Sequence, residues 1–419
     1  MALRSYVSRR QFLGGAASGL ALGFAAPYIL TANVFGANEQ VVTGHIGMGG
    51  QGMGNLNPHK ARCAAVCDVD KKRLEKARLA VGAKCEAYGD FRRLLDRKDI
   101  NAVVISTPDH WHALPTVRAC EAGKDVYCEK PLTLTIAEGR KMTQAARKYQ
   151  RIVQAGSQQR SDAKFRLACE LVRNGRIGNL QRVTVGIPGV NFKGPAVPDS
   201  DSPEELDYDL WLGPAPRRPY NVNRVHYNFR FFWDYSGGQI TNWGAHHLDI
   251  AQWAMGTDDS GPIEIEGEAK HHPEGWYEVP QSFKVTYKYA SGVTVTCGMG
   301  LPGGATFEGT NGKIYVDRGK LSSEPADIID VTKNPLKEGD TRLYVSGNHH
   351  GNWLDCIKTR KPPICEVEIG HRSATVCHLG NIAVRCKRKI KWDPAKEQVI
   401  GDEEANKMVD KAYREPWRL

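Results

Sequence analysis

Apolar and polar positions alternate in short blocks between residue 41 and about residue 155. Apolar runs that indicate buried strands are separated by segments whose apolar positions recur every three or four residues, as in amphipathic helices. The predicted strands are 41–46, 64–67, 101–106, 125–128 and 152–155, and the predicted helices are 71–81, 91–96, 113–122 and 136–149. Strands that alternate with helices predict a doubly wound parallel sheet, which binds its ligands at the carboxyl ends of the strands.

The pattern changes after about residue 160, where strand signals dominate. Strands are expected at 183–185, 278–289, 293–299 and 313–316, and helices at 165–173, 350–359 and 372–385. Few helices between strands favour a mainly antiparallel sheet, so the fold class is α/β with a C-terminal α+β domain. We expect domains at 38–160 and 161–419. The Pro- and Gly-rich stretch 188–219 is expected to form a lid or an interface element, because it is too long for a simple connector.

A glycine-rich turn follows the first predicted strand. The pattern G-x-G-x-x-G lets a strand turn tightly into a helix whose first amides face a pyrophosphate. Its residues are Gly47, Gly49, Gly50, Gln51 and Gly52. Asp68 ends the next strand, at the offset where a carboxylate binds the ribose hydroxyls of NAD. A plain glycine-rich turn is the alternative interpretation. NAD is expected over NADP because Asp68 repels a 2′-phosphate, although the nearby Lys71, Lys72 and Arg73 weaken that preference.

A second group of polar residues lies between Gly237 and Asp249. On one continuous helix, Asn242, His246 and Asp249 share a face because they are spaced four and three residues apart. A histidine on such a face can accept the proton of a substrate hydroxyl if a neighbour fixes its tautomer. The alternative is a polar helix start with hydrogen-bonded histidines.

Composition narrows the classes of function. The net charge is +10, but the basic residues are scattered and no nucleic-acid motif is present, so a solvated basic surface is expected and no nucleic-acid partner. Eleven cysteines form an odd and diffuse set, and several lie in apolar strand-like runs, which favours buried reduced thiols over a disulfide framework. No cysteine or histidine spacing is typical of zinc, so no structural metal is expected.

The first residues are typical of a targeting segment. Ser8–Leu13 contains a twin-arginine pattern, and the apolar stretch 14–26 is too short and glycine-rich for a stable membrane span. We therefore exclude residues 1–37 from the fold and expect twin-arginine export to the periplasm. Ala37 is the best cleavage position, although an uncleaved segment that anchors the chain in the membrane is a second interpretation.

Several motifs together resemble the Gfo/Idh/MocA family of glucose-fructose oxidoreductases and inositol dehydrogenases. They are the glycine turn, Asp68, Ser106-Thr107-Pro108-Asp109-His110, the run from Ala122 to Glu129-Lys130-Pro131, and the stretch from Gly237 to Asp249. The tail resembles an exported branch of that family, in Asn352–Cys356, Gly370–Ser373 and Asn381–Ala383. The resemblance covers essentially the whole chain after the targeting segment. It implies a Rossmann domain followed by a substrate-binding and oligomerisation domain.

The resemblance also implies an activity and a set of site residues. The activity is oxidation of a hydroxyl of a sugar, glycoside or cyclitol, or the reverse, with NAD or NADP. Lys130 would stabilise the alkoxide, since a cation there opposes the developing charge, and His246 would be the general base. The other residues implied to bind the cofactor are Thr107, Pro108, His110 and Glu129. Asn242 departs from the family aspartate, and Asp249 is the residue expected to replace that charge.

Three functions follow as alternatives. The first is an exported dehydrogenase. The second is a glycosidase that oxidises its substrate transiently on a retained NAD, and the third is a non-catalytic sugar sensor, which only Asn242 supports. Because free NAD is scarce outside the cytoplasm, an exported enzyme is expected to hold its cofactor tightly. We also expect a homo-oligomer formed through the C-terminal sheet.

Overall fold

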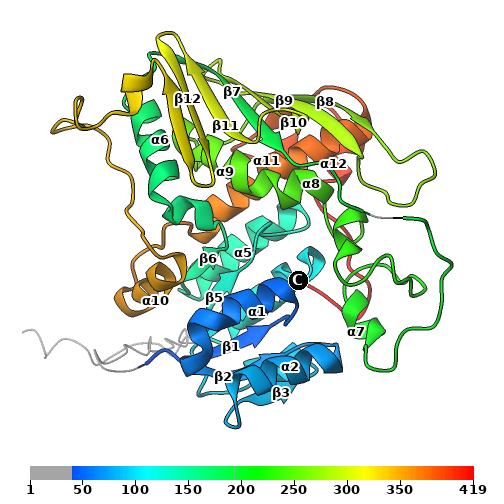
Figure 1. The fold of residues 1–419 in the computed structure, drawn as a ribbon. Coiled ribbons are helices and arrows are strands. Elements are labelled where there is room, and N and C mark those ends of the chain that lie inside the picture. Colours follow the sequence, from blue (N-terminus) through cyan, green and yellow to red (C-terminus); the bar gives the residue numbers. More distant parts are fainter. Residues whose placement is uncertain (1–39, 193) are drawn as a thin grey trace, which may run out of the picture. The chain divides into compact units, whose positions relative to one another are not determined.

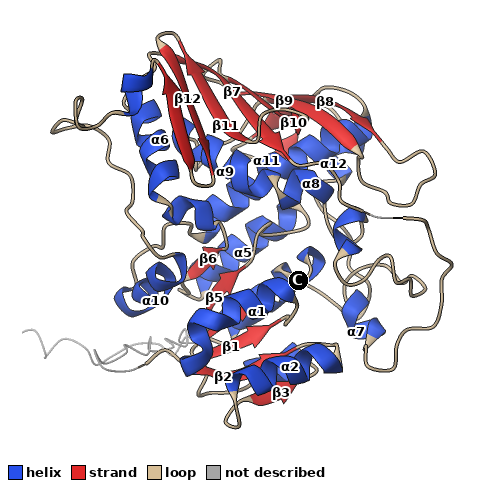
Figure 2. Cartoon of the chain, in the orientation of Figure 1, coloured by secondary structure: helices blue, strands red, loops and turns tan. Residues whose placement is uncertain are grey.

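The computed structural model describes residues 40–192 and 194–419, so the predicted targeting segment lies outside the described residues. The compact unit that starts at Glu39 contains two sheets and their covering helices (Figures 1 and 2). No helix within the described ranges has the length and apolar character needed to cross a membrane.

The first sheet has six parallel strands in the order β3-β2-β1-β4-β5-β6 and confirms the predicted doubly wound fold. Its strands are β1 (Thr43–Ile46), β2 (Cys63–Cys67), β3 (Glu86–Tyr88), β4 (Ala102–Ile105), β5 (Asp125–Cys128) and β6 (Val153–Ala155). The intervening helices are α1 (Gly50–Leu56), α2 (Lys71–Val81), α3 (Phe91–Leu95), α4 (Ala113–Glu121) and α5 (Ile136–Lys148), with the 3-10 turns η1 (Asn57–Arg62) and η2 (Asp109–Trp111). Strand order reverses between β1 and β4, where such sheets bind ligands.

Side-chain caps set the starts of two of these helices. Asp70 accepts hydrogen bonds from the backbone N of Lys72 and Arg73 at the start of α2. Thr135 and Glu138 form a capping box at the start of α5. Each cap satisfies amides that have no partner inside the helix, so α2 and α5 begin where the sequence pattern predicts.

The second sheet has nine strands in the order β13-β12-β11-β7-β10-β9-β8-β14-β15. Every neighbouring pair is antiparallel except β7 with β10, which confirms the mainly antiparallel sheet. Its strands are β7 (Leu180–Ile187), β8 (Glu264–Lys270), β9 (Ser282–Lys288), β10 (Thr294–Met299), β11 (Gly304–Gly309), β12 (Gly312–Asp317), β13 (Lys320–Glu324), β14 (Ile390–Asp393) and β15 (Gln398–Val399).

Helices cover the second sheet, and α6, α9 and α11 contact it directly. The helical elements of this half are η3 (Gln158–Ser161), α6 (Ala163–Arg173), α7 (Tyr208–Leu212), η4 (Asn228–Phe231), α8 (Gly238–Asn242), α9 (Gly244–Met255), η5 (Ala326–Ile329), α10 (His349–Thr359), α11 (Val367–Cys386) and α12 (Glu403–Lys407). Helix α11 also packs against α5 of the first half.

Residues from the end of the chain complete the core around the first sheet. Val367 of α11, Trp417 and Leu419 belong to this core or pack on it. The ring of Trp417 lies 4.9 Å from the ring of Trp111. The core around the first sheet therefore depends on residues that lie far beyond its last strand in the sequence.

All eleven cysteines are buried free thiols, as expected. Among the described residues, Glu368, His371 and Glu397 alone approach one another closely enough to ligate a metal ion. Arg140 donates hydrogen bonds to both of these carboxylates and Arg372 pairs with both. Two guanidinium groups already balance the charge there, and the expected absence of a structural metal stays a prediction.

Candidate functional site

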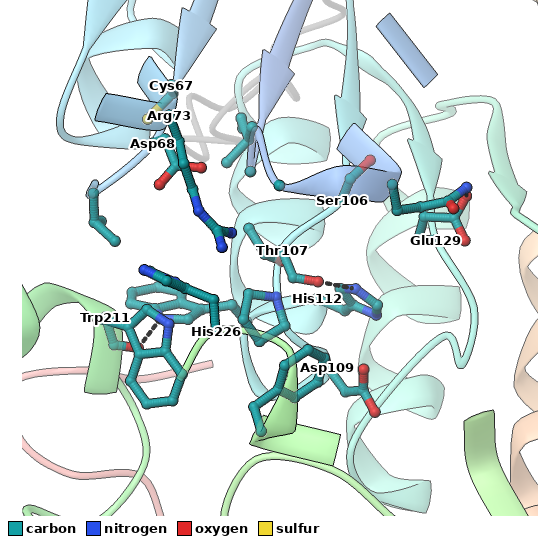
Figure 3. A pocket seen from close by; sticks show the side chains of 18 of the residues that line it. Cys67, Asp68, Arg73, Ser106, Thr107, Asp109, His112, Glu129, Trp211 and His226 are labelled. Carbon is teal, nitrogen blue, oxygen red and sulfur yellow. Dashed lines mark hydrogen bonds between the residues drawn. The ribbon is translucent and has the colours of Figure 1, made fainter. Parts of the chain in front are cut away.

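A cavity of about 380 Å³ lies at the carboxyl ends of β1, β2, β4 and β5. Its lining comes from the turns after these strands and from residues 210–230 of the second half (Figure 3). The lining residues that the sequence predicted are Gly47, Gly49, Gly50, Gln51, Asp68, Thr107, Pro108, Glu129 and Lys130. Because parallel strands end at one edge, motifs far apart in the chain meet here.

Two glycines are required by the fold itself. Gly47 has a φ of +85°, and a Cβ there would lie 2.7 Å from the backbone of Ser106 and Thr107. A Cβ on Gly52 would lie 1.9 Å from the carbonyl oxygen of Gly47, so Gly52 allows α1 to pack against the turn rather than lining the cavity. By contrast, a Cβ on Gly50 meets nothing within 4 Å. Its open position leaves room for a ligand group close to the backbone.

Asp68 is fixed by backbone amides at the end of β2. Its Oδ2 accepts a hydrogen bond from the N of Met48 (2.6 Å), and its Oδ1 accepts one from the N of Asp70 (2.9 Å). Burial raises the pKa of this carboxyl, and the two amide bonds oppose that effect. Each carboxylate oxygen keeps a lone pair for a ribose hydroxyl. Arg73 lies beside Asp68 in the cavity (Figure 3). It is one of the three basic residues expected from the sequence to weaken the preference for NAD over NADP.

Glu129 is held by amide side chains rather than by cations. Its Oε1 accepts hydrogen bonds from the Nε2 of Gln51 (3.0 Å), the Nδ2 of Asn55 (3.0 Å) and the Nε2 of Gln158 (3.1 Å). These bonds fix the carboxylate at the start of the turn that presents Lys130. Gln51 therefore has a structural partner as well as a place in the cavity lining.

Lys130 follows β5, and its side chain reaches the second half of the protein. Its Nζ donates to the backbone O (3.0 Å) and the Oδ1 (2.9 Å) of Asn242. Asn242 in turn donates from Nδ2 to the Oε1 of Gln239 (3.0 Å). Burial lowers the pKa of Lys130, and neighbouring Glu129 and Asp109 counteract this in part. The partner at hydrogen-bond distance is neutral, so the ammonium charge is oriented but not paired.

His246 lies in α9 and forms no ring hydrogen bond with any described residue. Its Nδ1 is buried without a partner, and its ring lies 5.7 Å from the ring of Trp243. Burial lowers the pKa of His246 well below the usual value, and the charge of Lys130 lowers it further. The imidazole is therefore neutral at neutral pH and can accept a proton. The adjacent His247 instead stacks on Trp243, with its Nε2 3.9 Å from Asp317.

The prediction that one helical face holds Asn242, His246 and Asp249 was wrong. The helix is interrupted at Trp243. Asn242 therefore ends α8, and the other two residues lie in α9. The side chain of Asn242 binds Lys130 and does not orient His246. Asp249 is fully buried, where it accepts hydrogen bonds from Arg160 (2.8 Å) and Ser373, so it does not supply a charge to His246.

His110 also departs from its expected role. Its side chain is buried outside the cavity lining, with Nε2 3.0 Å from the carbonyl oxygen of Trp211, and burial lowers its pKa to about 3. The next histidine, His112, lines the cavity instead, with its ring nitrogens 2.7 Å and 2.9 Å from the carbonyl oxygens of Pro131 and Thr107. His110 lies within the 3-10 turn η2 and His112 directly follows it, and only His112 is placed in the cavity lining.

Sequence reasoning missed the residues that cover the cavity. We call residues 205–230 the cover segment; His226, Tyr227, Phe229 and Arg230 line the cavity from it. Three contacts hold the cover segment against the β2–α2 turn. Two are backbone hydrogen bonds, from the N of Lys71 to the O of Glu205 (2.9 Å) and from the N of Asp207 to the O of Val69 (3.0 Å). The third is between the Nε2 of His226 and the Oδ2 of Asp70 (3.0 Å). The sequence feature that pointed to a cover was the long loop 188–219, which was expected to form a lid or an interface element. The cover segment extends past the end of that loop.

Two family models match most of the chain. Residues 41–157 match the family model "Oxidoreductase family, NAD-binding Rossmann fold", and residues 165–419 match "Oxidoreductase family, C-terminal alpha/beta domain". Inositol 2-dehydrogenase of Salmonella typhimurium is 29% identical over 157 residues, 35% of this chain and 46% of that protein, so the chain spans about half the length of such relatives. The 2,7-anhydro-N-acetylneuraminate hydratase of Mediterraneibacter gnavus is 30% identical over 319 residues, 73% of this chain and 75% of that protein.

A solved structure shows the same fold. The dehydrogenase WlbA of Bordetella pertussis, in complex with NADH and UDP-GlcNAcA, aligns with a TM-score of 0.64 at 17% identity and covers 85% of this chain and 99% of that one. The two family matches reach from the first strand of the Rossmann sheet to the last residue. The chain belongs to the Gfo/Idh/MocA oxidoreductase family.

Proposed function

We propose that the protein transfers a hydride between a nicotinamide cofactor and a secondary hydroxyl or ketone of a sugar, glycoside or cyclitol. The observation on which this rests is Lys130, which lines the cavity and whose Nζ donates a hydrogen bond to Asn242 Oδ1 (2.9 Å). Because its closest partner is a neutral amide, its charge is free to stabilise a substrate alkoxide. Membership of an oxidoreductase family with an NAD-binding domain supports the same chemistry.

The cavity fits NAD. The open backbone at Gly50 suits a pyrophosphate, and the lone pairs of Asp68 suit the adenosine ribose. Thr107, Pro108 and Glu129 line the cavity together with Lys130. When bound, NAD accepts or returns a hydride at its nicotinamide ring.

Lys130 and His246 divide the remaining work. In the oxidation direction His246 accepts the hydroxyl proton, because burial keeps its imidazole neutral. Lys130 binds the same oxygen and opposes the negative charge that develops as the proton leaves. In the reverse direction the protonated imidazole returns the proton to the oxygen.

A second candidate is a redox-neutral reaction on a retained cofactor. Two observations favour it: a relative that covers most of this chain is named a hydratase, and the cover segment closes over the cavity through three backbone and side-chain contacts with the β2–α2 turn. A non-catalytic sensor was supported only by Asn242, and its contact with Lys130 gives that residue a part in the dehydrogenase instead.

We also propose that residues 1–37 direct export through the twin-arginine route and that the protein forms homo-oligomers through its nine-stranded sheet. Arg9→Lys with Arg10→Lys would then leave the protein in the cytoplasmic fraction, whereas the unchanged protein appears in the periplasmic or membrane fraction. Light scattering during size-exclusion chromatography measures the oligomeric state.

The test of the proposed function has two steps. Mass spectrometry of the nucleotide that co-purifies is expected to find NAD. Absorbance of the reduced nicotinamide is then followed with a panel of hexoses, glycosides, inositols and uronates. Reduction of NAD by one of these compounds supports the dehydrogenase activity. Product formed without net reduction of NAD supports the retained-cofactor reaction, and neither outcome with any sugar contradicts both.

A further inference from the structure

Arg318 is fixed in position although its side chain is exposed. It lies on the turn between β12 and β13, and its Nε donates to the Oε1 of buried Gln159 (3.2 Å). Its guanidinium carbon lies 4.8 Å from the centre of the Trp243 ring, which also contacts the His246 ring. Gln159 donates from Nε2 to the backbone O of His246 (3.2 Å). These contacts tie Arg318 to the start of α9, beside the proposed base.

The charge of Arg318 has no carboxylate partner within 4.0 Å among residues 40–192 and 194–419. Its neighbour Asp317 accepts a hydrogen bond from the backbone N of Arg318 (2.7 Å) and faces His247 at 3.9 Å. Within the cavity, Ser236 donates a hydrogen bond to Asp109, and three amide side chains surround one oxygen of Glu129. The nearby acids are therefore engaged elsewhere.

Two further cations, Arg230 and Lys130, line the cavity. Neither forms an ion pair with a described carboxylate. Arg230 is held by the carbonyl oxygen of Tyr227 (2.9 Å) and by the faces of the Tyr227 and Phe229 rings. Arg318 lies close enough for its charge to lower the pKa of both Lys130 and His246. Cations that lack a paired anion create a positive potential there, which favours an anionic ligand.

We propose that Arg318 binds the carboxylate of an anionic sugar, a hexuronate or a uronic-acid glycoside, and presents one of its hydroxyls to Lys130 and His246. This inference rests on the proposed function and names its substrate class. Arginine suits the role because its planar guanidinium binds a carboxylate through two parallel hydrogen bonds, and only Nε of Arg318 is already used. A solvated surface arginine would need neither the buried glutamine nor the tryptophan face.

The test compares each acid with its own neutral ester. NAD-loaded protein is assayed with D-glucuronate, D-galacturonate and their methyl glycosides, and with the methyl esters of these compounds. Arg318→Gln is expected to lower kcat/KM for the acid by about 10- to 100-fold, as for the loss of hydrogen bonds to a charged group, and to change that for the ester only a few-fold. Bound NAD is expected to be unchanged. The control is Arg182→Gln on β7, because Arg182 is exposed and pairs with Glu308 away from the site.

Calorimetric titration with D-glucuronate and D-galacturonate gives a second readout that does not need turnover. Uronate binding that Arg318→Gln weakens supports the inference, even if no sugar reduces NAD and the proposed function fails. Turnover of neutral sugars without discrimination between acid and ester overturns the inference and leaves the proposed function standing. Arg318-dependent use of sulfated or phosphorylated sugars, with none of the uronates bound, also overturns it.

Discussion

Lys130 is a buried cation whose partner at hydrogen-bond distance is an asparagine. Replacing it with alanine removes the charge that opposes the alkoxide, so Lys130→Ala is expected to lower kcat by about 10²- to 10⁴-fold while NAD stays bound. Steady-state kinetics and nucleotide content measure the two effects. Lys164→Ala is the control, because Lys164 is exposed and its Nζ bonds only the backbone O of Gly319. Activity within a few-fold of the unchanged protein would assign Lys130 a structural role.

The pH dependence of the same charge can be tested at its neutral partner, Asn242. Burial lowers the pKa of Lys130, so the protonated form is lost at a lower pH than for an ordinary lysine, and activity falls on the alkaline side. Asn242→Asp places a carboxylate beside Nζ and raises that pKa. The alkaline limb of the kcat/KM profile is therefore expected to move to higher pH, while the acid limb set by His246 moves little. An unmoved alkaline limb would contradict the role of Lys130 as the charged group.

Fixed spacing made part of this site predictable. Gly47 and Asp68 stand at intervals that one strand-turn-helix unit imposes, and Lys130 stands in a short motif after a strand. The partners were not predictable, because Lys130 and Asn242 are 112 positions apart and Arg160 and Asp249 are 89 apart. Such pairs form only when separate elements pack together, and local sequence patterns do not predict which distant elements will do so.

At the level of elements, the break between α8 and α9 decides what Asp249 does. It turns Asp249 toward η3, where Arg160 pairs with both Asp249 and the more exposed Asp258. Removing one partner of a buried ion pair leaves an uncompensated charge. Asp249→Asn is therefore expected to reduce the free energy of unfolding by about 3–5 kcal/mol in denaturant titrations.

Asp258→Asn is the matched control for that variant, because it removes the partly exposed carboxylate that also pairs with Arg160. A smaller loss of stability is expected there, since solvent screens the remaining charge. The pH profile of correctly folded Asp249→Asn is expected to match that of the unchanged protein. If the Asp249→Asn protein is as stable as the unchanged protein and its pH profile is shifted, Asp249 takes part in proton transfer and the assignment to a structural ion pair is wrong.

Apolar content explains which elements the sequence predicted. Five of the Rossmann strands are largely buried and appear as apolar runs, so they were found with small boundary errors. The sixth, β3 at the edge of that sheet, has no buried residue and was missed. Strands β8, β11, β13, β14 and β15 of the second sheet were missed as well. β8 (EIEGEAK) buries only Ile265, and β11 contains Gly304 and Gly309, so neither has a strong strand signal; pairing with neighbours in the sheet determines both.

At the scale of the whole molecule, the cover segment joins the two halves across the cavity. His226 is its side-chain contact with Asp70 and also lines the cavity. His226→Ala removes that hydrogen bond and is expected to raise the rate of NAD dissociation by about 2- to 10-fold. Stopped-flow fluorescence of reduced nicotinamide measures the release. His271→Ala, at an exposed position outside the cavity lining, is the control, and equal release rates in the two variants would show that the segment does not retain the cofactor.

Residues far along the sequence impose an order on folding. Trp417 packs against Trp111, which lines the cavity, and Val367 completes the core around the Rossmann sheet. Both residues lie far beyond β6 (Val153–Ala155), the last strand of that sheet, so the Rossmann segment by itself exposes apolar surface and an unfinished cavity wall. The nucleotide domain therefore reaches its native packing only once these distant residues have docked on it.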